Sequence, residues 1–497
     1  MFEYFLTNKE LKKIELYKYI LFSKEGKTKK EIILAFPEIN QSTGTRYLKE
    51  LIEDLFSCTY GEVILKEAFS GKFYVAFNEE TTYTADFTID QLRYFYIEKN
   101  QLFLLLRTLV NSNFETIEQL SQETNMSMPN LYRSLAVLNT ILKNFDVKIC
   151  LEDPSNFTGN EFGIRYFFYL VYGGIFRTTT DTPFRKNFPT ELLTIEKLKE
   201  QLDISKELSK SQENRVRLIY GISAWRMLYR KKSLNVDEKM LEDIQFFYNG
   251  KPLLHSEYSL KSRKILENES IMLSFFIQGL IYEVYSFEQR KKIVEKYCAS
   301  KLTISKQAEY ILFELSHLFE FCYTDKNYIE SYYLLILGLI FQKHLNLIVD
   351  PIYENSLTKN RQVFEKNQLL KESLPKLEKF LAQYIDFSNK DEIEKDYILF
   401  FYYQIINLNK AVQPINIFIE NTNNIIHAYT IKNKLLNVFN PTLLNFVTEP
   451  SKAYLLISNT YEGHFPNSER FYFNNIYDSK NWQTLFHFIS TKIYSKL

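Results

Sequence analysis

The sequence has little of what enzyme motifs and disulfide frameworks require. Only 13 of its 497 residues are glycine, and GxGxxG, GxxxxGKS/T, GxSxG and HExxH are all missing. Dinucleotide-binding, P-loop, serine hydrolase and zinc protease sites therefore lack their signatures. The four cysteines, at positions 58, 150, 298 and 322, form no CxxC pair, and their scarcity favours a reducing compartment. We expect a cytoplasmic protein that is not an enzyme and that has no cofactor and no metal site.

Charge of one sign and long apolar runs are lacking as well. The formal net charge is +1, so any attraction to nucleic acid must be local. The N-terminal segment carries charges throughout, and the most apolar runs, 162–176 and 331–341, are shorter than the ~20 residues that cross a bilayer. We therefore expect no targeting segment and no membrane partner. The length indicates several domains.

Helical periodicity covers most of the chain, with two exceptions. Over 62–77, two short β-rich runs flank Ser70-Gly71 and predict a hairpin. Near the C-terminus, a helix is predicted over about 423–439 among strands over 415–420, 443–449 and 453–460. This βα pattern is typical of a small α/β domain. Amphipathic helices are predicted throughout 161–410, so the fold class is mainly α.

Residues 117–136, IEQLSQETNMSMPNLYRSLA, predict two helices joined by a tight turn. Asn125 falls at the turn, because asparagine enters the left-handed region at modest cost. Ser127 is suited to cap the second helix, and Pro129 is tolerated in its first turn. The apolar stripe that would pack the second helix consists of Leu131, Leu135, Leu138 and Leu142. A helix-turn-helix that presents its second helix to DNA is one interpretation, and an ordinary helical hairpin is the other.

A shift of 87 residues aligns this pattern with an earlier stretch, 28–56. The aligned pairs are Ile33 with Leu120, Ile39 with Met126, Arg46 with Arg133, Leu48 with Leu135, Leu51 with Leu138 and Leu55 with Leu142. In the earlier copy, Thr28 and Glu31 have the spacing of a capping box. Gly44 stands where the later copy has a leucine, and Glu38 stands where it has the turn asparagine. The later copy therefore fits the template better.

The polar side chains outside the apolar stripes suit phosphates and base edges. In the later copy these side chains are Asn130, Tyr132, Arg133 and Ser134, and in the earlier copy they are Ser42, Thr43, Thr45, Arg46 and Lys49. The 62–77 hairpin follows the earlier recognition helix as a wing would, and a wing would add a contact to the DNA backbone. Neither helix is strongly basic, so we expect affinity to be spread over several modules.

In its order of parts the chain resembles the Mga/AtxA family of global virulence regulators of Gram-positive bacteria. Two helix-turn-helix units are followed closely by NFTGNEFGIRYFFYLVY, residues 156–172, then by a long helical middle and a small α/β end. The family has a GxE-x-x-IR type of stretch after its second DNA-binding unit. Gly159, Glu161, Ile164 and Arg165 come close to it, with Asn160 in place of an acidic residue.

The resemblance implies a DNA-binding transcriptional regulator linked to sugar phosphotransferase-system status. The implied domains are winged helix-turn-helix domains over 1–80 and 81–160, phosphotransferase-system regulation domains (PRDs) over 161–295 and 296–410, and an enzyme IIB-like domain over 411–497. Promoter DNA, a second copy of the chain in a homodimer, and phosphocarrier proteins are the implied partners.

In such a family, regulation can act through histidine phosphorylation, which adds up to about two negative charges. The candidates are His317 and His344, on predicted helices of the PRD region, and His255, in a predicted loop. For any one of them taken singly, an ordinary structural role is the favoured interpretation. An active enzyme IIB carries phosphate on a cysteine after its first strand. The residues after 415–420 here are Asn421, Thr422, Asn423 and Asn424, which leaves an interaction role for this domain.

Two other function classes compete with a DNA-binding regulator. One is a helical interaction scaffold with no nucleic-acid role, since the basic footprint is weak. The other is an RNA-binding antiterminator with the same PRD middle. Such antiterminators begin with a small β-rich domain, whereas residues 1–56 are predicted to be helical, so this alternative ranks last.

Overall fold

The structure is a computed structural model, and it consists mainly of helices with a few small sheets, which confirms the mainly α fold class. It describes residues 2–23, 25–176, 194–254, 262–281, 284–345, 368–385, 387–388, 392–409, 414–420, 425–459, 465–466, 468–473 and 476–496. The chain divides into two compact units. One contains residues 1–306 and 336–351, and the other contains 307–335 and 352–497.

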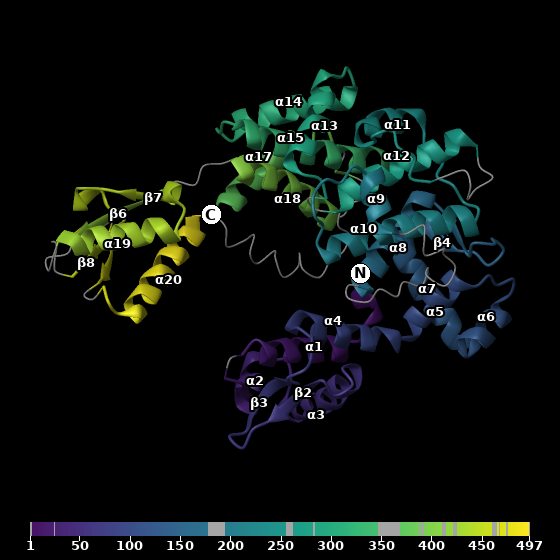
Figure 1. The fold of residues 1–497 in the computed structure, drawn as a ribbon, viewed down its shortest axis with the longest axis horizontal. Helices are drawn as coiled ribbons and strands as arrows, with labels where there is room; N and C mark the ends of the chain where they lie inside the picture. The colour runs from purple at the N-terminus through teal and green to yellow at the C-terminus, as the bar shows by residue number, and fades with distance from the viewer. Residues whose placement is uncertain are drawn as a thin grey trace. The chain divides into compact units, whose positions relative to one another are not determined.

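The first unit begins with three helices that pack against a small antiparallel sheet (Figure 1). After a short turn, η1 (Phe2–Phe5), the elements are α1 (Asn8–Leu21), β1 (Lys27–Thr28), α2 (Lys29–Ala35), α3 (Gln41–Cys58), β2 (Val63–Glu67) and β3 (Lys72–Phe77). Capping boxes at Thr7 and Thr28 begin α1 and α2, because each threonine satisfies amide groups that the first turn leaves free. The predicted hairpin over 62–77 is confirmed, with strand order β1-β3-β2.

Helix α4 (Ala85–Glu98) packs against this first bundle. The Tyr17 and Thr88 hydroxyls lie 2.6 Å apart in a buried hydrogen bond between α1 and α4. The Asp54 carboxylate of α3 accepts from Lys13 Nζ at 2.5 Å and from the Tyr96 hydroxyl at 2.7 Å. Burial and the hydrogen bond to this carboxylate raise the pKa of Tyr96. The three helices α1, α3 and α4 are thereby joined by buried polar contacts.

A second bundle follows, with its own pair of short strands. It consists of α5 (Gln101–Asn111), α6 (Ile117–Thr124), α7 (Met128–Lys143), β4 (Val147–Ile149) and β5 (Phe157–Gly159). The expectation of helix outside 62–77 and the C-terminal region is wrong at β4 and β5, which pair antiparallel. Gly159 makes this pairing possible, because a Cβ atom on it would lie 2.1 Å from the Asp146 carbonyl oxygen. Three-residue strands are too short for an alternating pattern to reveal them.

Helix α8 (Glu161–Ile175) connects the second bundle to the helical middle. Thirteen of its 15 residues are buried, so it is a core helix on all sides, as its apolar sequence predicts. A Cβ atom on Gly163 would lie 2.0 Å from the Phe145 carbonyl oxygen, so glycine allows α8 to approach the end of α7. Helix α10 packs along α8. The elements of this part of the chain are α9 (Ile195–Gln201), α10 (Lys210–Ala224), the π-helical turn η4 (Trp225–Tyr229), α11 (Glu238–Ile244), η5 (Gln245–Phe247), α12 (Arg263–Leu280) and α13 (Phe287–Ala299).

Four charged side chains form a buried ionic network between α8, η4 and α12. Arg165 donates from Nη1 and Nη2 to the two oxygens of Glu269, at 2.6 and 3.0 Å. Arg226 donates from Nη2 and Nε to the two oxygens of Glu161, at 2.6 and 3.0 Å, and Arg165 Nε joins the same carboxylate at 3.0 Å. Burial by itself would raise the pKa of Glu161, but these guanidinium groups hold it below its usual value.

The remaining helices belong mostly to the second unit. Helices α14 (Thr303–Leu318) and α15 (Asp325–Ile340) have residues in both units, and the π-helical turn η7 (Phe341–Leu345) belongs to the first. Helices α17 (Gln368–Leu381) and α18 (Glu392–Asn409) pack together, with Lys395 Nζ 2.5 Å from Glu378 Oε1.

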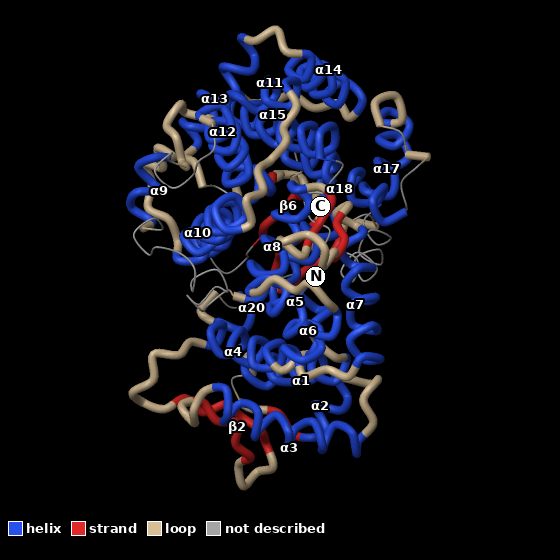
Figure 2. Tube along the Cα trace, turned by 90° about the vertical axis from the view of Figure 1, so that its right-hand side faces the viewer, coloured by secondary structure: helices blue, strands red, loops and turns tan. Residues whose placement is uncertain are grey.

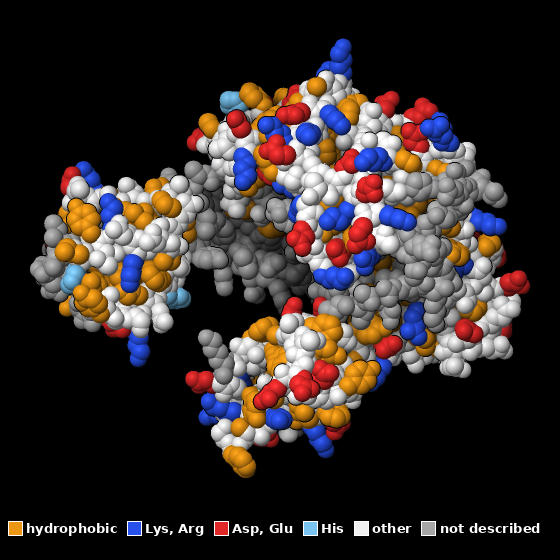
Figure 3. Space-filling model, viewed as in Figure 1, with side chains coloured by type: hydrophobic (Ala, Val, Ile, Leu, Met, Phe, Trp, Pro, Cys, Tyr) orange, Lys and Arg blue, Asp and Glu red, His pale blue; other side chains and the backbone are white. Residues whose placement is uncertain are grey.

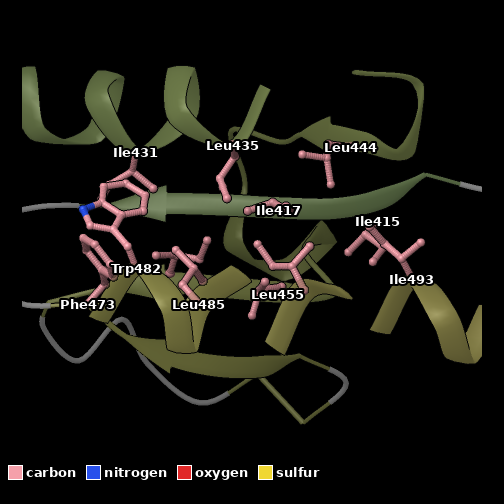
Figure 4. Close-up of a cluster of buried hydrophobic side chains, with 12 residues drawn as sticks. Ile415, Ile417, Ile431, Leu435, Leu444, Leu455, Phe473, Trp482, Leu485 and Ile493 are labelled. Carbon is pink, nitrogen blue, oxygen red and sulfur yellow. The ribbon is translucent and has the colours of Figure 1, made fainter. Parts of the chain in front are cut away.

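The chain ends in a parallel four-stranded sheet of order β7-β6-β8-β9. Its elements are β6 (Ile415–Glu420), α19 (Ile425–Val438), η9 (Pro441–Leu443), β7 (Leu444–Phe446), η10 (Pro450–Lys452), β8 (Leu455–Ser458), β9 (Glu469–Tyr472) and α20 (Ser479–Lys496). Ile417 of β6 and Leu455 of β8 share one buried cluster with Leu435 of α19 and Leu485 of α20 (Figure 4). The strands predicted over 415–420, 443–449 and 453–460 and the helix between the first two are confirmed within a residue or a few at each end, and β9 extends the sheet.

Two expectations about the whole chain can be compared with the described residues. None of the helices found there combines the length and the apolar character needed to cross a membrane. All four cysteines are free, two of them exposed, at positions 298 and 322.

The buried ionic network yields a prediction for stability. Glu269→Gln keeps the shape of the side chain but leaves the Arg165 guanidinium short of a buried counter-charge. Breaking a buried ion pair in this way typically costs about 3 kcal/mol. We expect amide hydrogens of α8 to exchange roughly a hundredfold faster, measured by hydrogen–deuterium exchange mass spectrometry.

The matched control is Glu449→Gln, which removes the charge from an exposed pair with Lys452 at 2.7 Å. Exposed pairs contribute about 0–1 kcal/mol, so exchange should change little. Equal exchange in α8 for Glu269→Gln and the wild type would show that the network does not stabilise this helix.

Candidate nucleic-acid interface

The turn between α6 and α7 has the geometry of a helix-turn-helix. Asn125 is left-handed, with φ 52° and ψ 32°, as predicted. The Ser121 hydroxyl donates to the Met126 carbonyl oxygen at 2.6 Å, and Met126 is buried, which fixes the turn from inside. Pro129 lies in the first turn of α7. Ser127 occupies the N-cap position, but its side chain makes no capping hydrogen bond.

The first bundle repeats this arrangement. Helix α3 begins at Gln41 and α7 begins at Met128, which is the same 87-residue shift that relates the two sequence copies. Asn40 caps α3, because its Oδ1 accepts from the Thr43 amide at 2.8 Å. Gly44 is buried against Ile33 and Ile39, so this position belongs to the core in both copies. The repeat is therefore structural, and the departure at Gly44 does not disrupt it.

On α7 the apolar stripe is buried much as predicted. Leu131, Leu138 and Leu142 are fully buried, whereas Leu135 is half-buried. Ile141, which was not predicted, is buried with them.

Tyr132 and Arg133 are exposed on α7, and Ser134 is half-buried. Asn130 is half-buried, and its Nδ2 donates to Gln101 Oε1 of α5 at 2.6 Å. One amide hydrogen of Asn130 is therefore already used within the protein.

On α3 the candidates form a more open polar surface. Thr45, Arg46 and Lys49 are exposed, and Thr43 is half-buried. The Thr45 hydroxyl donates back to the Gln41 carbonyl oxygen at 3.0 Å. Among the residues that the structure describes, no carboxylate lies within ion-pair distance of Arg46 or Lys49. Their charges are available to a phosphate backbone.

Three exposed lysines near α3 were missed by the sequence reasoning. Lys29 and Lys30 begin α2, and Lys66 lies on β2. Lys29 Nζ is 3.6 Å from Glu67 Oε1, so its charge is partly balanced. These lysines could have been predicted from the sequence, because they stand at the start of a predicted helix and in the predicted hairpin, next to the predicted recognition helix. Figure 3 shows cationic and anionic side chains interspersed on the face in view.

The two hairpins differ in what their connecting loops contact. Between β4 and β5, Asp153 forms an ion pair with Lys232 at 2.7 Å, and Arg230 Nη1 donates to the Pro154 carbonyl oxygen at 3.0 Å. Burial would raise the pKa of Asp153, but hydrogen bonds from Lys232 and Ser155 lower it. Burial, together with the neighbouring charge of Arg226, lowers the pKa of Arg230 to about 10. This loop is attached to the segment after η4, which limits its access to DNA.

The predicted regulatory histidines lie in different surroundings. His317 is exposed on α14, with its ring 4.4 Å from the Phe313 ring. The side chain of His344 in η7 is only 6% exposed, and its Nε2 lies 2.7 Å from Asp243 Oδ2 of α11, which Lys343 Nζ approaches at 2.6 Å. Burial would raise the pKa of Asp243, but hydrogen bonds from His344 and Lys343 hold it below its usual value. His255 lies outside the described residues.

The comparisons with known proteins agree with this geometry. Residues 85–172 match the family model of the Mga helix-turn-helix domain. The match begins at α4, contains the whole second bundle and ends within α8. No curated protein matches the chain significantly. Residues 85–172 are therefore similar to the Mga helix-turn-helix domain, which is consistent with a regulator of the Mga/AtxA family.

Proposed function

We propose that this protein is a DNA-binding transcriptional regulator that reads promoter DNA with α3 and α7. The observation that carries the proposal is the structural repeat: two helices, starting 87 residues apart, each with a buried apolar stripe and an exposed polar surface. Such a helix can lie in the major groove with its exposed side chains at base edges and phosphates. The proposal assigns no catalytic residue and no cofactor to the chain, and it places the protein in the cytoplasm.

The modest charge of the two helices limits what each can contribute. Thr43, Thr45, Arg46 and Lys49 are the proposed contacts of α3, and Asn130, Tyr132, Arg133 and Ser134 are those of α7. Only three of these eight residues carry a positive charge, so electrostatic affinity per unit should be small. Each chain has two DNA-reading helices, and a dimer would have four. Once one helix is bound, the effective concentration of the others rises, which would supply the remaining affinity.

Single alanine variants test both readers. Arg46→Ala and Arg133→Ala should each weaken binding about tenfold and lower the slope of log K against log salt by about one. By sequence, Arg133 is the stronger candidate because the later copy fits the helix-turn-helix template better. In the structure α3 and α7 begin at matching positions, so we expect the two substitutions to weaken binding by similar factors. Filter binding over a salt series measures both quantities, with 40-base-pair duplexes selected from a random pool.

Lys452→Ala serves as the control, since this exposed lysine lies in the C-terminal α/β domain and pairs with Glu449. It should change neither affinity nor slope. Unaltered binding by both arginine variants, with normal circular dichroism, would remove α3 and α7 as readers. Absence of any duplex binding by the wild type would favour the helical scaffold.

We further propose that the helical middle forms two PRDs that respond to phosphocarrier proteins of the sugar phosphotransferase system. Exposure of His317 supports it as the accessible acceptor. His344 is engaged by Asp243, so a phosphoryl group on its Nε2 would have to break that buried contact. Two negative charges placed there without solvent are costly, which would make such a modification a structural switch.

Charge substitutions separate the two histidines. His344→Asp places a second carboxylate beside Asp243 and should loosen α11, whereas His317→Asp adds a charge in water and should not. Hydrogen exchange in α11 should be fastest for His344→Asp and intermediate for His344→Ala, and His317→Asp should exchange as the wild type does. Identical exchange in all three variants and the wild type would mean that the contact has no role in holding α11.

The C-terminal α/β domain, similar in our proposal to enzyme IIB, is the proposed site of self-association into a homodimer. Its described surface exposes several large apolar side chains, namely Ile426, Tyr429, Tyr472 and Tyr477. Exposed apolar groups of this kind are typical of interaction sites. Its buried cluster is built entirely from residues between 415 and 493, so the domain has a core of its own.

Removal of residues 411–497 should shift the protein toward monomer in analytical ultracentrifugation. Tyr429→Glu should do the same without truncation, because it puts a charge into the proposed interface. Gln483→Glu, an exposed change on α20, is the matched control and should leave the assembly intact. If the truncated chain sediments as the full-length protein does, the helical middle holds the interface instead.

A further inference from the structure

The turn between β2 and β3 presents one aromatic side chain in a defined position. Gly71 donates its amide to the Ala68 carbonyl oxygen at 2.8 Å, and the Ala68 amide donates to Lys72 at 2.9 Å. Gly71 has a φ of +70°, which only glycine adopts at little cost. The result is a closed four-residue turn with Phe69 fully exposed. Figures 1 and 2 show this hairpin projecting from the helices of the first bundle.

The inner face of the hairpin fixes its position relative to α3. Val63 and Leu65 of β2 and Phe73 of β3 are buried on this face, and β2 packs along α3. The direction of the turn is therefore set by the same core that positions the recognition helix. Nothing in the described part of the first unit covers Phe69, although burying a phenylalanine side chain is worth about 2 kcal/mol.

The outer face of the hairpin combines cations with an aromatic ring. Lys66 pairs across the strands with Tyr74, which is 40% exposed. Lys72 follows the turn, 3.7 Å from Glu25, and Lys29 of α2 lies beside Glu67. A DNA duplex carries negative phosphates on the outside and stacked, largely apolar bases between them. An apolar tip flanked by lysines is complementary to such a surface.

We propose that Phe69 is a wedge that enters the minor groove, partly unstacks one base step and bends the duplex away from itself. The proposal rests on the DNA-binding function proposed above and deepens it. Proteins that insert apolar side chains into the minor groove kink DNA by about 20–90°. The cost of the kink depends on the step, and pyrimidine–purine steps such as TA and CA are the least costly. Phe69 thereby selects DNA by deformability, in keeping with the small number of charged contacts on α3.

The test uses full-length protein and a 40-base-pair duplex, selected from a random pool, with donor and acceptor dyes at its two ends. A second version carries 2-aminopurine at a TA step. Wild-type protein should raise energy transfer and 2-aminopurine fluorescence. Phe69→Ala should remove both signals and weaken binding about tenfold, since a base stacked on an aromatic ring contributes on that order. Phe69→Leu, still an apolar wedge, should restore most of the bend.

Phe22→Ala is the matched control, because Phe22 is also exposed, at 68%, but lies at the end of α1. It should bend DNA as the wild type does. The wedge is overturned if Phe69→Ala bends DNA as much as the wild type does, or if the wild type binds DNA without bending it. In both cases the proposed DNA-binding function would stand. If the wild type binds no duplex, the wedge and the proposed function both fall. If Phe69→Ala changes the sedimentation of the protein but not its DNA binding or bending, the tip belongs to a self-association surface and the wedge is likewise overturned.

Discussion

The pairing of four buried charges around α8 is the constraint from which the organisation of the first unit follows. The guanidinium groups of Arg165 and Arg226 are buried, and an unpaired buried charge is costly, so Glu161 and Glu269 must stay beside them. The network has a geometric as well as an energetic effect, because two bidentate contacts permit few arrangements of α8, η4 and α12. At this same end of α8, between Glu161 and Arg165, Gly163 lies against the Phe145 carbonyl oxygen just after α7, so the second bundle and the helical middle share one core.

The same coupling explains why the two helix-turn-helix bundles are not equivalent. The loop between β4 and β5 is anchored by Arg230 and Lys232, which lie four and six residues after the network residue Arg226 in the chain. The described ion pairs of the first hairpin, Lys29 with Glu67 and Lys72 with Glu25, stay within the first bundle, and Phe69 at its turn is exposed. The second bundle is thus joined to the helical middle through its hairpin loop, and the first hairpin makes no such connection among the contacts described.

Charge also organises the contact between η7 and α11. Asp243 accepts from both Lys343 and His344, and these hydrogen bonds outweigh the effect of burial on its pKa. Because the folded-state pKa is lowered, this carboxylate stabilises the fold above its unfolded pKa of about 4, and the contribution is lost as the pH falls below that value. In the proposed regulation, a phosphoryl group on His344 would place negative charge beside the Asp243 carboxylate, whereas one on exposed His317 would lie in water.

The sequence by itself determined what depends on local pattern. The left-handed turn at Asn125, the capping box at Thr28, the hairpin over 62–77 and the strand at 415–420 follow from a few adjacent residues, and each was predicted. The candidate residues Tyr132, Arg133, Thr45, Arg46 and Lys49 are exposed because helical periodicity separates them from the buried stripe. Tertiary structure alone decided the rest. Glu161 meets Arg226 and Arg165 meets Glu269 across 65 and 104 residues, and β4 pairs with β5 around a loop held by distant side chains. Such contacts depend on which helices pack together, and no periodicity within one segment encodes its partner.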